Sequence, residues 1–572
     1  MKKIQILAPI KNQKDIFALK KTDIQKLGLK GVYIYHDYFL EEGFDKIHAF
    51  YDEIRELGIE FYINFKNSID EKQMNDAKKI LTFLQIAPVD GVLVNDYAFL
   101  SLLKTDHLPF KVIVDSGFNM HNLAGVEFVS SFITPESITL TEEVYLKNIS
   151  KIKKYTNTKF SINSDNLPWC AEDIKKSNAI NLIIIKGDFN NQKKLINGIE
   201  LIRNIIDNPK NYCDKKLPFR QTKDNSYETN HFMGRFISED GNEIAFKGNI
   251  KKFEWDAKPV KLNKDLEFNN LHLPNINLRL KSLAQINALK TFIQKYNYNP
   301  VTSIEYGEIL STNDLAKNSY NDIMEKVQIF CSQYDIKLLL STPKFLLERD
   351  FDRVYEHLLL CKKQLNPYSI VINNIGFWWN IINDEDFDNT KIELGPGLNI
   401  KSSPSILCLL RQHTIDAIDL SAFEHIKNLK YGMSQIKDKI PIRKLTVGGN
   451  VRIQSSGLCP LNKDPVVVSR LSCTAPCQKS YYAMLDPEIN KPFPFAVDGF
   501  CRMHMYKNQV LDIFKYVPKL QKIGINEFII DFHSIPSKFV PILLKRFINA
   551  YTSSQNYKTD ANFLTCQYGL EG

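Results

Sequence analysis

Short runs of β-branched residues alternate with helical patterns over about the first 210 residues, and this alternation constrains the fold more than any other feature. Strands that alternate with helices predict a parallel sheet of βα units, and eight of them predict a TIM-type barrel. One helix is expected over 41–57, ending before Gly58. The expected strands are IQILAP (4–9), GVYIYHD (31–37), EFYINF (60–65), GVLVND (91–96), KVIVDSG (111–117), EFVSSFI (127–133), KFSINS (159–164) and NLIIIKG (181–187).

The same plan restarts near residue 276, which predicts a duplicated domain. Gly117-x-Asn119 and Gly397-x-Asn399 lie 280 residues apart, each after a corresponding strand. The expected strands of the second copy are INLRLKS (276–282), VTSIEYG (301–307), IKLLLST (336–342), SIVINNIG (369–376), KIELGPG (391–397), AIDLSAF (417–423), IRKLTVGG (442–449) and EFIIDFH (527–533).

The predicted fold is therefore α/β, with two tandem TIM-type (β/α)8-like barrels joined by a small β module. We place the first barrel at 1–210, the module at 211–275 and the second barrel at 276–572. Alternating residues around an Asp-Gly-Asn turn at 240–242 predict a hairpin within the module.

Four of the ten cysteines lie between the seventh and eighth expected strands of the second copy, namely Cys459, Cys473, Cys477 and Cys501. Four converging thiolates are the ligand set of a tetrahedral zinc or an iron–sulfur cluster. One CxxxC spacing, two distant single cysteines and no histidine pair favour a cluster over zinc. The alternative is four buried thiols without a metal. The insertion at 448–505 follows a barrel strand, so it belongs to the C-terminal face, where barrel active sites lie.

The motif Ser456-Gly-Leu-Cys459 is followed by Cys473-Thr-Ala-Pro-Cys477-Gln-Lys-Ser-Tyr. This pair of motifs resembles the cysteine signature of peptidase family U32, and Cys501, a helix-like stretch at 508–525 and a strand at 526–532 follow in the family's order. The resemblance implies a 4Fe–4S cluster on the four cysteines and a link to oxygen-independent hydroxylation of tRNA, ribosomal RNA or the ubiquinone precursor. It also implies a prephenate-type oxygen donor.

The chain departs from the family pattern in ways that bear on its activity. Many members read Glu-x-Phe-x-His-Gly where this chain has Lys444-Leu-Thr-Val-Gly-Gly449, and Arg452 stands where they carry a further cysteine. Ser311 replaces a cluster cysteine of the members that act on the ubiquinone precursor, so Cys501 is expected to supply the fourth ligand. Without that Glu and His, a hydrolase lacks a general base in this stretch, which disfavours proteolysis.

Polar residues at the C-terminal ends of the second set of strands are the candidate substrate contacts. Lys444 and Arg452 suit an anionic substrate, and their alternative role is solvated surface charge. The aromatic run at 377–379 could stack on a base or quinone ring, or pack on the barrel wall. The candidate catalytic residues are Glu305, Glu308, Asn374, Lys444, Arg452 and Asp531, with Asn373, Asn399 and His533 as further contacts.

Charge and hydropathy bound the partners and the class of protein. A net charge of +9 over 572 residues permits an RNA partner without requiring one. No run approaches the ~18 apolar residues that span a bilayer, and the N-terminus lacks a secretory signal, so we expect a cytoplasmic protein. A family-related protein is a further expected partner. Three functions stay open: an oxygen-independent hydroxylase, a collagenase-like hydrolase, and a non-catalytic redox or assembly partner.

Overall fold

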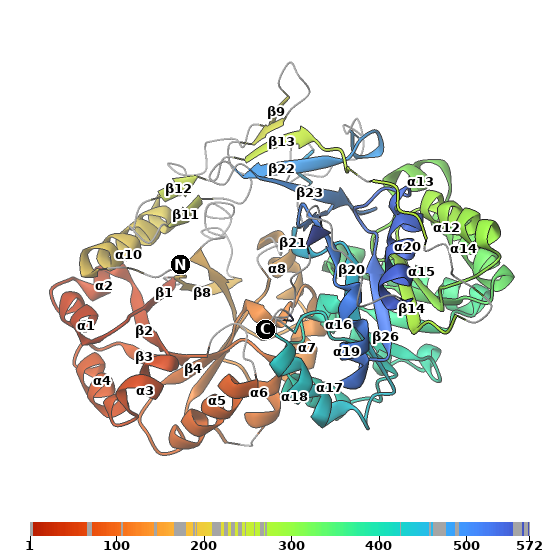
Figure 1. Ribbon diagram of the computed structural model, residues 1–572. Coiled ribbons are helices and arrows are strands. Elements are labelled where there is room, and N and C mark those ends of the chain that lie inside the picture. Colours follow the sequence, from red (N-terminus) through yellow and green to blue (C-terminus); the bar gives the residue numbers. More distant parts are fainter. Residues whose placement is uncertain are drawn as a thin grey trace.

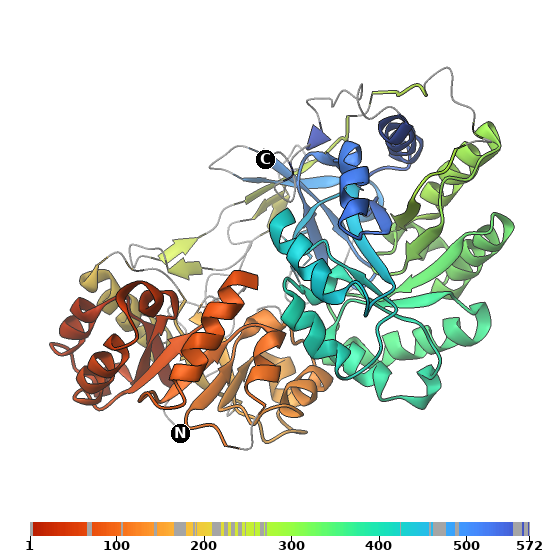
Figure 2. The ribbon, with the colours of Figure 1, turned by 60° about the horizontal axis from the view of Figure 1, so that its bottom comes forward.

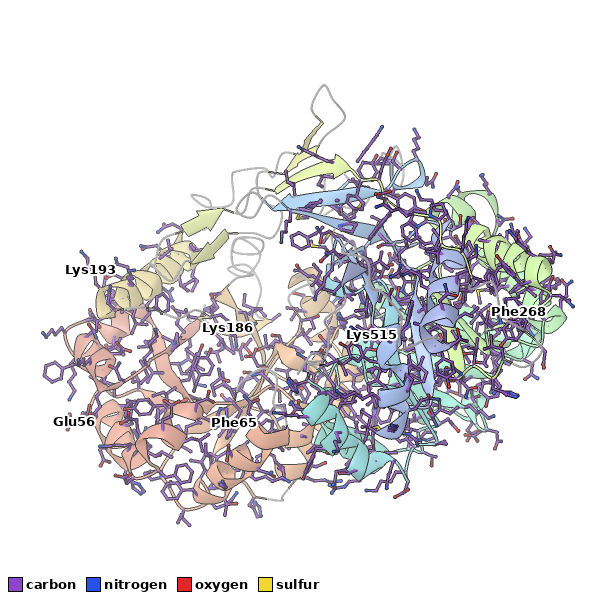
Figure 3. The ribbon with its side chains drawn as sticks, viewed as in Figure 1. Glu56, Phe65, Lys186, Lys193, Phe268 and Lys515 are labelled. Carbon is purple, nitrogen blue, oxygen red and sulfur yellow. The ribbon has the colours of Figure 1, made fainter. Side chains whose placement is uncertain are left out.

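Two closed parallel barrels lie side by side in the computed structural model of the protein, with their helices outside the strands (Figures 1 and 2). Side chains fill the space between strands and helices in both barrels (Figure 3). The described residues run from 4 to 570, except 66–70, 105–106, 142–145, 165–178, 187–188, 190, 209–218, 222–226, 230–234, 238–242, 246–247, 257, 263–267, 269–270, 424, 457–458, 462–475, 487–490, 553–562 and 565–569.

The first barrel closes when its last strand pairs in parallel with its first. Its strands are β1 (Gln5–Pro9), β2 (Leu29–Tyr35), β3 (Glu60–Asn64), β4 (Gly91–Val94), β5 (Lys111–Val114), β6 (Ser137–Thr139), β7 (Phe160–Asn163) and β8 (Ile180–Ile184). Its helices are α1 (Gln13–Leu19), α2 (Ile24–Leu27), α3 (Asp37–Glu42), α4 (Lys46–Arg55), α5 (Glu71–Phe83), α6 (Tyr97–Leu102), α7 (Leu123–Ser130), α8 (Leu146–Ile152) and α10 (Gln192–Asp207).

Two predictions for the first barrel were wrong in detail. The expected sixth strand at 127–133 lies mostly in α7, and β6 follows it. Helix α7 is apolar on several sides because it packs against both barrels, so its sequence lacks the polar face that marks a surface helix. The helix expected over 41–57 is broken at Gly43, whose φ of 101° is incompatible with a continuing helix.

The second barrel confirms all eight expected strands, and pairing of β19 with β20 closes it. Its strands are β14 (Asn275–Leu280), β15 (Ser303–Tyr306), β16 (Lys337–Ser341), β17 (Ser369–Ile372), β18 (Ile392–Leu394), β19 (Ala417–Asp419), β20 (Ile442–Gly449) and β26 (Glu527–Asp531), with β25 (Val510–Asp512) and β27 (Phe563–Leu564) added outside β20. Its helices are α12 (Leu283–Tyr296), α13 (Thr312–Lys317), α14 (Tyr320–Gln333), α15 (Glu348–Leu365), α16 (Ile375–Ile382), α17 (Ser403–Leu410), α18 (Ile426–Ile436), α19 (Val517–Lys522) and α20 (Phe539–Thr552).

The helix expected at 508–525 is shorter than its sequence indicated. Strand β25 and a 3-10 turn occupy 510–516, and only α19 is helical. Because β25 pairs with the end of β20, the first apolar residues of this stretch are used in the sheet rather than in a helix.

Strands of the β module and of the cysteine-bearing insertion form one sheet. The insertion supplies β21 (Arg452–Ser456), β22 (Tyr482–Asp486), β23 (Lys491–Val497) and β24 (Met503–Tyr506). The module supplies β9 (Phe219–Gln221), β10 (Tyr227–Thr229) and β13 (Gly248–Lys252), and β13 pairs antiparallel with β22. The expected hairpin is confirmed as β11 (Arg235–Ile237) and β12 (Glu243–Ala245), which pair antiparallel. The seven-stranded sheet, which contains the four strands of the insertion together with β13, β10 and β9, lies near the top of the molecule in Figure 1.

The barrels meet through equivalent helices. Helix α7 packs on α16, and α6 packs on α17. Helices α6 and α16 follow the fourth strands of their barrels, whereas α7 and α17 follow the fifth, so the contact is reciprocal and approximately two-fold symmetric. The predicted duplication is visible in the turns as well, because Asn119 and Asn399 both end a 3-10 turn in the left-handed conformation, with φ of 51° and 55°.

Among the helices of the described ranges, none is both long and apolar enough to cross a bilayer.

Candidate functional site

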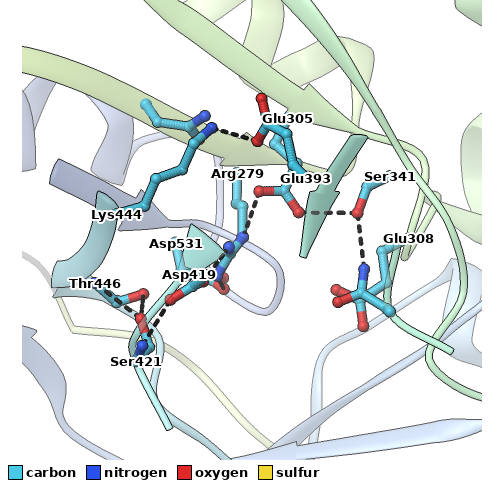
Figure 4. A network of polar contacts seen from close by, with 12 residues as sticks. Arg279, Glu305, Glu308, Ser341, Glu393, Asp419, Ser421, Lys444, Thr446 and Asp531 are labelled. Carbon is cyan, nitrogen blue, oxygen red and sulfur yellow. Dashed lines mark hydrogen bonds and ion pairs between the residues drawn. The ribbon is translucent and has the colours of Figure 1, made fainter. Parts of the chain in front are cut away.

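The interior of the second barrel holds layers of charged side chains instead of an apolar core (Figure 4). In the layer nearest the strands' N-terminal ends, Lys444 Nζ lies 2.6 Å from Glu393 and 2.8 Å from Glu527. Burial opposes the charge of Lys444, but the two carboxylates outweigh it and raise the pKa of the amine. Lys444 is 3% exposed, so its charge is compensated inside the protein and it is not a surface cation.

The next layer is centred on Arg279. Its guanidinium donates to Glu305 at 2.8 Å and to Asp419 at 2.5 Å, and it lies 3.9 Å from Asp531. Ser341 Oγ donates to the second oxygen of Glu305 at 2.8 Å. Burial would lower the pKa of Arg279, but the three carboxylates raise it well above its ordinary value. Two of the predicted residues, Glu305 and Asp531, therefore meet around an arginine that the sequence analysis did not select.

At the mouth of the barrel, Glu308 forms an ion pair with Arg452. Burial alone would raise the pKa of Glu308, but Arg452, His533 and His504 lower it, so the carboxylate is ionised at neutral pH. Among the described residues, Oε2 of Glu308 has no hydrogen-bond partner, and neither has the hydroxyl of Tyr506, although both residues are buried. Unpaired buried polar atoms are unfavourable, so both atoms are available to a ligand.

Two histidines near the mouth of the barrel also contact carboxylates. His533 Nδ1 lies 3.3 Å from Asp531, and this histidine and Arg279 outweigh burial to lower the pKa of that carboxyl. His504 lies between Ser455 at 3.1 Å and Asp498 at 3.3 Å. The contacts of His504 therefore lie within the cysteine-bearing insertion, whereas the Arg452–Glu308 ion pair attaches β21 to the barrel.

A small cavity of about 80 Å³ opens beside Glu308, at the C-terminal ends of β15 and β16. Its apolar lining includes Leu310, Leu315, Val354 and Leu358. Arg353 and His357 of α15 also line it, and burial followed by the charge of Arg353 lowers the pKa of His357. Gly499 and Phe500 belong to the lining as well. The cavity therefore adjoins the turn that carries Cys501.

Three of the four predicted cysteine ligands lie in one cluster. Cys459, Cys477 and Cys501 pack with Met503 and Met505 on one face of the seven-stranded sheet. Cys473 lies outside the described residues. Within the described ranges, no three His, Cys, Asp or Glu side chains meet the geometry of a metal site. The three cysteines thus share one apolar cluster, and their ligation of a metal stays a prediction.

Hydrogen bonds to Asp498 hold the backbone of the turn that carries Cys501. The amide of Cys501 donates to Asp498 O at 3.0 Å, and the amide of Arg502 donates to Asp498 Oδ1 at 2.9 Å. Cys501 has a φ of 62°, a left-handed conformation that is uncommon for residues other than glycine. Such strain persists only where the surrounding contacts enforce it, and it is common at ligand-binding positions.

Strand alternation separates the thiols from the barrel mouth. Along β24, Met503 and Met505 point to the cysteine cluster, whereas His504 contacts Asp498 and Ser455. Tyr506, which shares the parity of His504, is electrostatically coupled to Arg452, Asp531 and Glu308. One face of the sheet therefore carries the sulfur side chains. The other face carries His504 and Tyr506, and Tyr506 lies near Asp531 and Glu308 of the barrel.

The remaining predicted contacts lie at the junction of the barrels or in turns. Asn374 caps α16 and bonds to Asn122 of the first barrel at 3.1 Å. Phe377 and Trp378 are fully buried, and Trp378 packs edge-on against Phe128 of α7. The aromatic run at 377–379 therefore packs between the barrels, as its alternative interpretation predicted. Asn373 holds Gly397 through a 2.9 Å hydrogen bond.

Several residues of the site were missed from the sequence, chiefly Arg279, Glu393, Asp419, Asp498, His504 and Glu527. Four of these are charged residues at inward positions of expected strands. A charged residue flanked by apolar neighbours, as in Asn-Leu-Arg279-Leu or Ile-Glu393-Leu, is the signal that could have found them.

Comparisons with known proteins give fold likenesses and one family match. The C-terminal domain of a putative chitinase from Desulfitobacterium hafniense DCB-2 is 10% identical, covering 49% of this chain and 99% of that one, with a TM-score of 0.27. The YdjI aldolase from Escherichia coli K12 is 9% identical, covering 35% and 80%, with a TM-score of 0.26. The U32 peptidase Mk0906 is 7% identical, covering 49% and 96%, with a TM-score of 0.27. At such scores these likenesses carry no functional argument.

No curated protein matches the chain. The sequence model described as peptidase family U32 matches residues 40–163, which include β3 to β7 of the first barrel. The match thus lies in the barrel without the cysteine signature, and it confirms the predicted resemblance of this chain to peptidase family U32.

Proposed function

We propose that this protein binds a 4Fe–4S cluster through Cys459, Cys473, Cys477 and Cys501, and takes part in oxygen-independent hydroxylation at the mouth of its second barrel. The observation that supports the proposal is that Cys459, Cys477 and Cys501 pack in one apolar cluster, on the sheet that contains β21 and β24. Thiolates in a sheltered, partly apolar setting suit iron–sulfur ligation.

The surroundings of the three described cysteines support the proposal. Cys459 is 3% exposed, and Met503, Met505 and Tyr482 shield the cluster of thiols from water. A bound cluster would supply one-electron transfer or redox sensing. The chain's own residues would hold it and set its distance from the pocket, because Cys501 directly follows the Gly499–Phe500 segment of the pocket wall.

The pocket beside Glu308 is the proposed substrate contact. Glu308 Oε2 would accept a hydrogen bond from a substrate hydroxyl or N–H, while Arg452 keeps this carboxylate ionised and oriented. An anionic substrate group would meet Arg353, since the charges of Arg279 and Lys444 are already compensated by carboxylates. The proposed substrate is an RNA base or a quinone precursor, with a small anionic oxygen donor.

The pairing of Arg279 and Lys444 with buried carboxylates also favours a second candidate, a redox or assembly partner without catalysis. Arg279 and Lys444 each have at least two carboxylate partners in the absence of substrate, as structural residues would. The two candidates share the cluster and differ in the use of the pocket.

Anaerobic reconstitution with iron and sulfide tests the cluster. We expect about four iron and four sulfide per chain, with a spin-resonance signal after reduction. Replacing Cys459, Cys477 or Cys501 by Ser should remove this signal. The control is Cys331→Ser, a change at a buried residue of α14 outside the predicted ligand set, which should keep the signal. Tight zinc binding in place of iron would contradict the proposal.

Hydroxylation is tested by comparing modified nucleosides and quinones in cells with and without the protein. A hydroxylated product that disappears with the protein supports the first candidate. An unchanged set of products, with the cluster present, supports the second. Casein cleavage that survives loss of the cysteines would instead indicate a hydrolase.

A further inference from the structure

We infer that the first barrel positions the cysteine-bearing turn of the second barrel, acting through the loop at 342–348 after β16. This loop is held at three successive backbone carbonyls. Asn374 Nδ2 donates to Lys344 O at 3.1 Å, the Arg502 guanidinium donates to Phe345 O, and Asn122 Nδ2 donates to Leu346 O at 2.8 Å. The three donors come from the second barrel, the cysteine insertion and the first barrel respectively.

On one side, the loop anchors Arg502, which directly follows Cys501. Arg502 is 1% exposed, and its guanidinium also forms an ion pair with Asp350 in the first turn of α15. Its backbone amide binds Asp498 Oδ1, and its carbonyl accepts from the Asp498 amide at 3.0 Å. Because these bonds close the turn around Cys501, a displaced guanidinium would loosen the turn.

On the other side, residues of the first barrel grip the loop. The ring of His121 packs against Phe345, with centroids 4.7 Å apart. The amide of Leu123 donates to Glu348 Oε2 at 2.8 Å, at the end of the loop. Asn122 has two roles, since its Oδ1 caps α7 by accepting from Gly125 while its Nδ2 reaches across to Leu346 O and to Asn374 Oδ1.

The loop also connects this contact with the proposed pocket. Ser341, Thr342 and Pro343, at its start, line the cavity beside Glu308. A single segment therefore links the first barrel, the pocket and Cys501. This gives the first barrel a positioning role in the site, in addition to burying helices α16 and α17.

The symmetry of the junction supplies a matched control. At its other end, Ser405 in the first turn of α17 donates to Asp96, which caps α6 as Asn374 caps α16. Among the described residues, neither Ser405 nor Asp96 hydrogen-bonds to the loop at 342–348. A contact that only joins the barrels should behave alike at both ends, whereas a positioning contact should act at one end.

The experiment compares Asn122→Ser with Ser405→Ala in the full-length protein by hydrogen–deuterium exchange. A serine at 122 keeps an oxygen that can cap α7 but lacks the amide donor to Leu346. We expect the amides of Cys501 and Arg502 to exchange about fivefold faster or more in Asn122→Ser. Ser405→Ala should leave their exchange unchanged.

The measurement is made on metal-free and on iron-reconstituted protein. The metal-free result needs no cluster, so it separates this inference from the proposed function on which its relevance to ligation rests. Equal exchange in the two variants, or a change confined to 342–348, would overturn the inference. Faster exchange in Arg502→Lys, which removes the bidentate fork, is expected as a positive control.

Discussion

The two barrels share one topology but differ in what fills them. The strands of the first barrel enclose an apolar cluster formed by Leu7, Tyr33, Tyr62, Leu93, Ile113, Leu182 and Ile184. The second barrel has Arg279, Glu305, Asp419, Lys444 and Asp531 at inward positions. Buried ion pairs contribute less to stability than apolar packing of the same volume. The difference indicates that one copy retains a stabilising core while the other has a polar interior suited to a site.

The sharpest test of this comparison replaces the inward residue of each first strand by methionine. Arg279→Met leaves Glu305 and Asp419 buried without their cation, and we expect a loss of about 3–5 kcal/mol of unfolding free energy. Leu7→Met conserves volume and apolarity and should cost less than about 1.5 kcal/mol. Chemical denaturation of both variants measures the costs. Equal losses would show that the two interiors are energetically equivalent and would break the comparison.

Acid should weaken the junction between the barrels. Burial, then the charges of Lys344 and Arg502, lowers the pKa of His121 from 6.5 to about 3. Between these values the unfolded chain binds a proton that the folded chain does not, so stability falls as pH falls from 6.5 towards 3. From pH 6.5 to 5 we expect a loss of roughly 2 kcal/mol from this group.

The variant His121→Gln isolates that contribution, because glutamine does not titrate. Denaturation of the wild type and of His121→Gln should be compared at several pH values. The carboxylates of the second barrel titrate in both proteins, so only the difference in slope reports on His121. Parallel pH profiles would show that His121 is not buried as a neutral ring.

The pocket beside Glu308 allows the second barrel to be tested by function as well as by stability. Glu308→Gln keeps the shape of the side chain but removes the ionised oxygen that has no hydrogen-bond partner within the described part of the chain. We expect at least about a tenfold decrease in the hydroxylated product of cells that carry this variant, corresponding to one lost charged hydrogen bond. The exposed Glu325→Gln on α14 serves as the control. Full product with Glu308→Gln would place the chemistry elsewhere.

The sequence predicted the barrels well and the site only partly. The eight strands of the second barrel were evident because their apolar runs are short and bounded by turns, whereas the α7 stretch was misassigned because a helix buried between two barrels has no polar face. Motif reasoning grouped Cys459, Cys477 and Cys501 as ligands; these three share one apolar cluster, while their role as ligands stays a prediction. It could not find Arg502 or Asn122, since their roles depend on contacts across 157 and 224 residues of chain.

The smallest expected effect tests what the two copies still share. A Cβ added to Gly117 would lie 2.5 Å from Asn95 O, and one added to Gly397 would lie 2.5 Å from Asn373 O. Both obstacles are backbone carbonyls at the ends of the fourth strands, so neither can move freely. Alanine at either glycine should therefore cost about 1–3 kcal/mol of unfolding free energy.

The informative quantity is the difference between these two costs, measured by denaturation under one set of conditions. Because the turns have the same geometry although the interiors have diverged, we expect the two losses to agree within about 0.5 kcal/mol, the accuracy to which separate sites usually add. The double variant should then lose the sum, since the sites belong to different barrels. Unequal losses would mean that the turn beside the polar barrel is supported by its charged interior, in which case divergence of the two copies extends beyond their cores into the frame that holds the site.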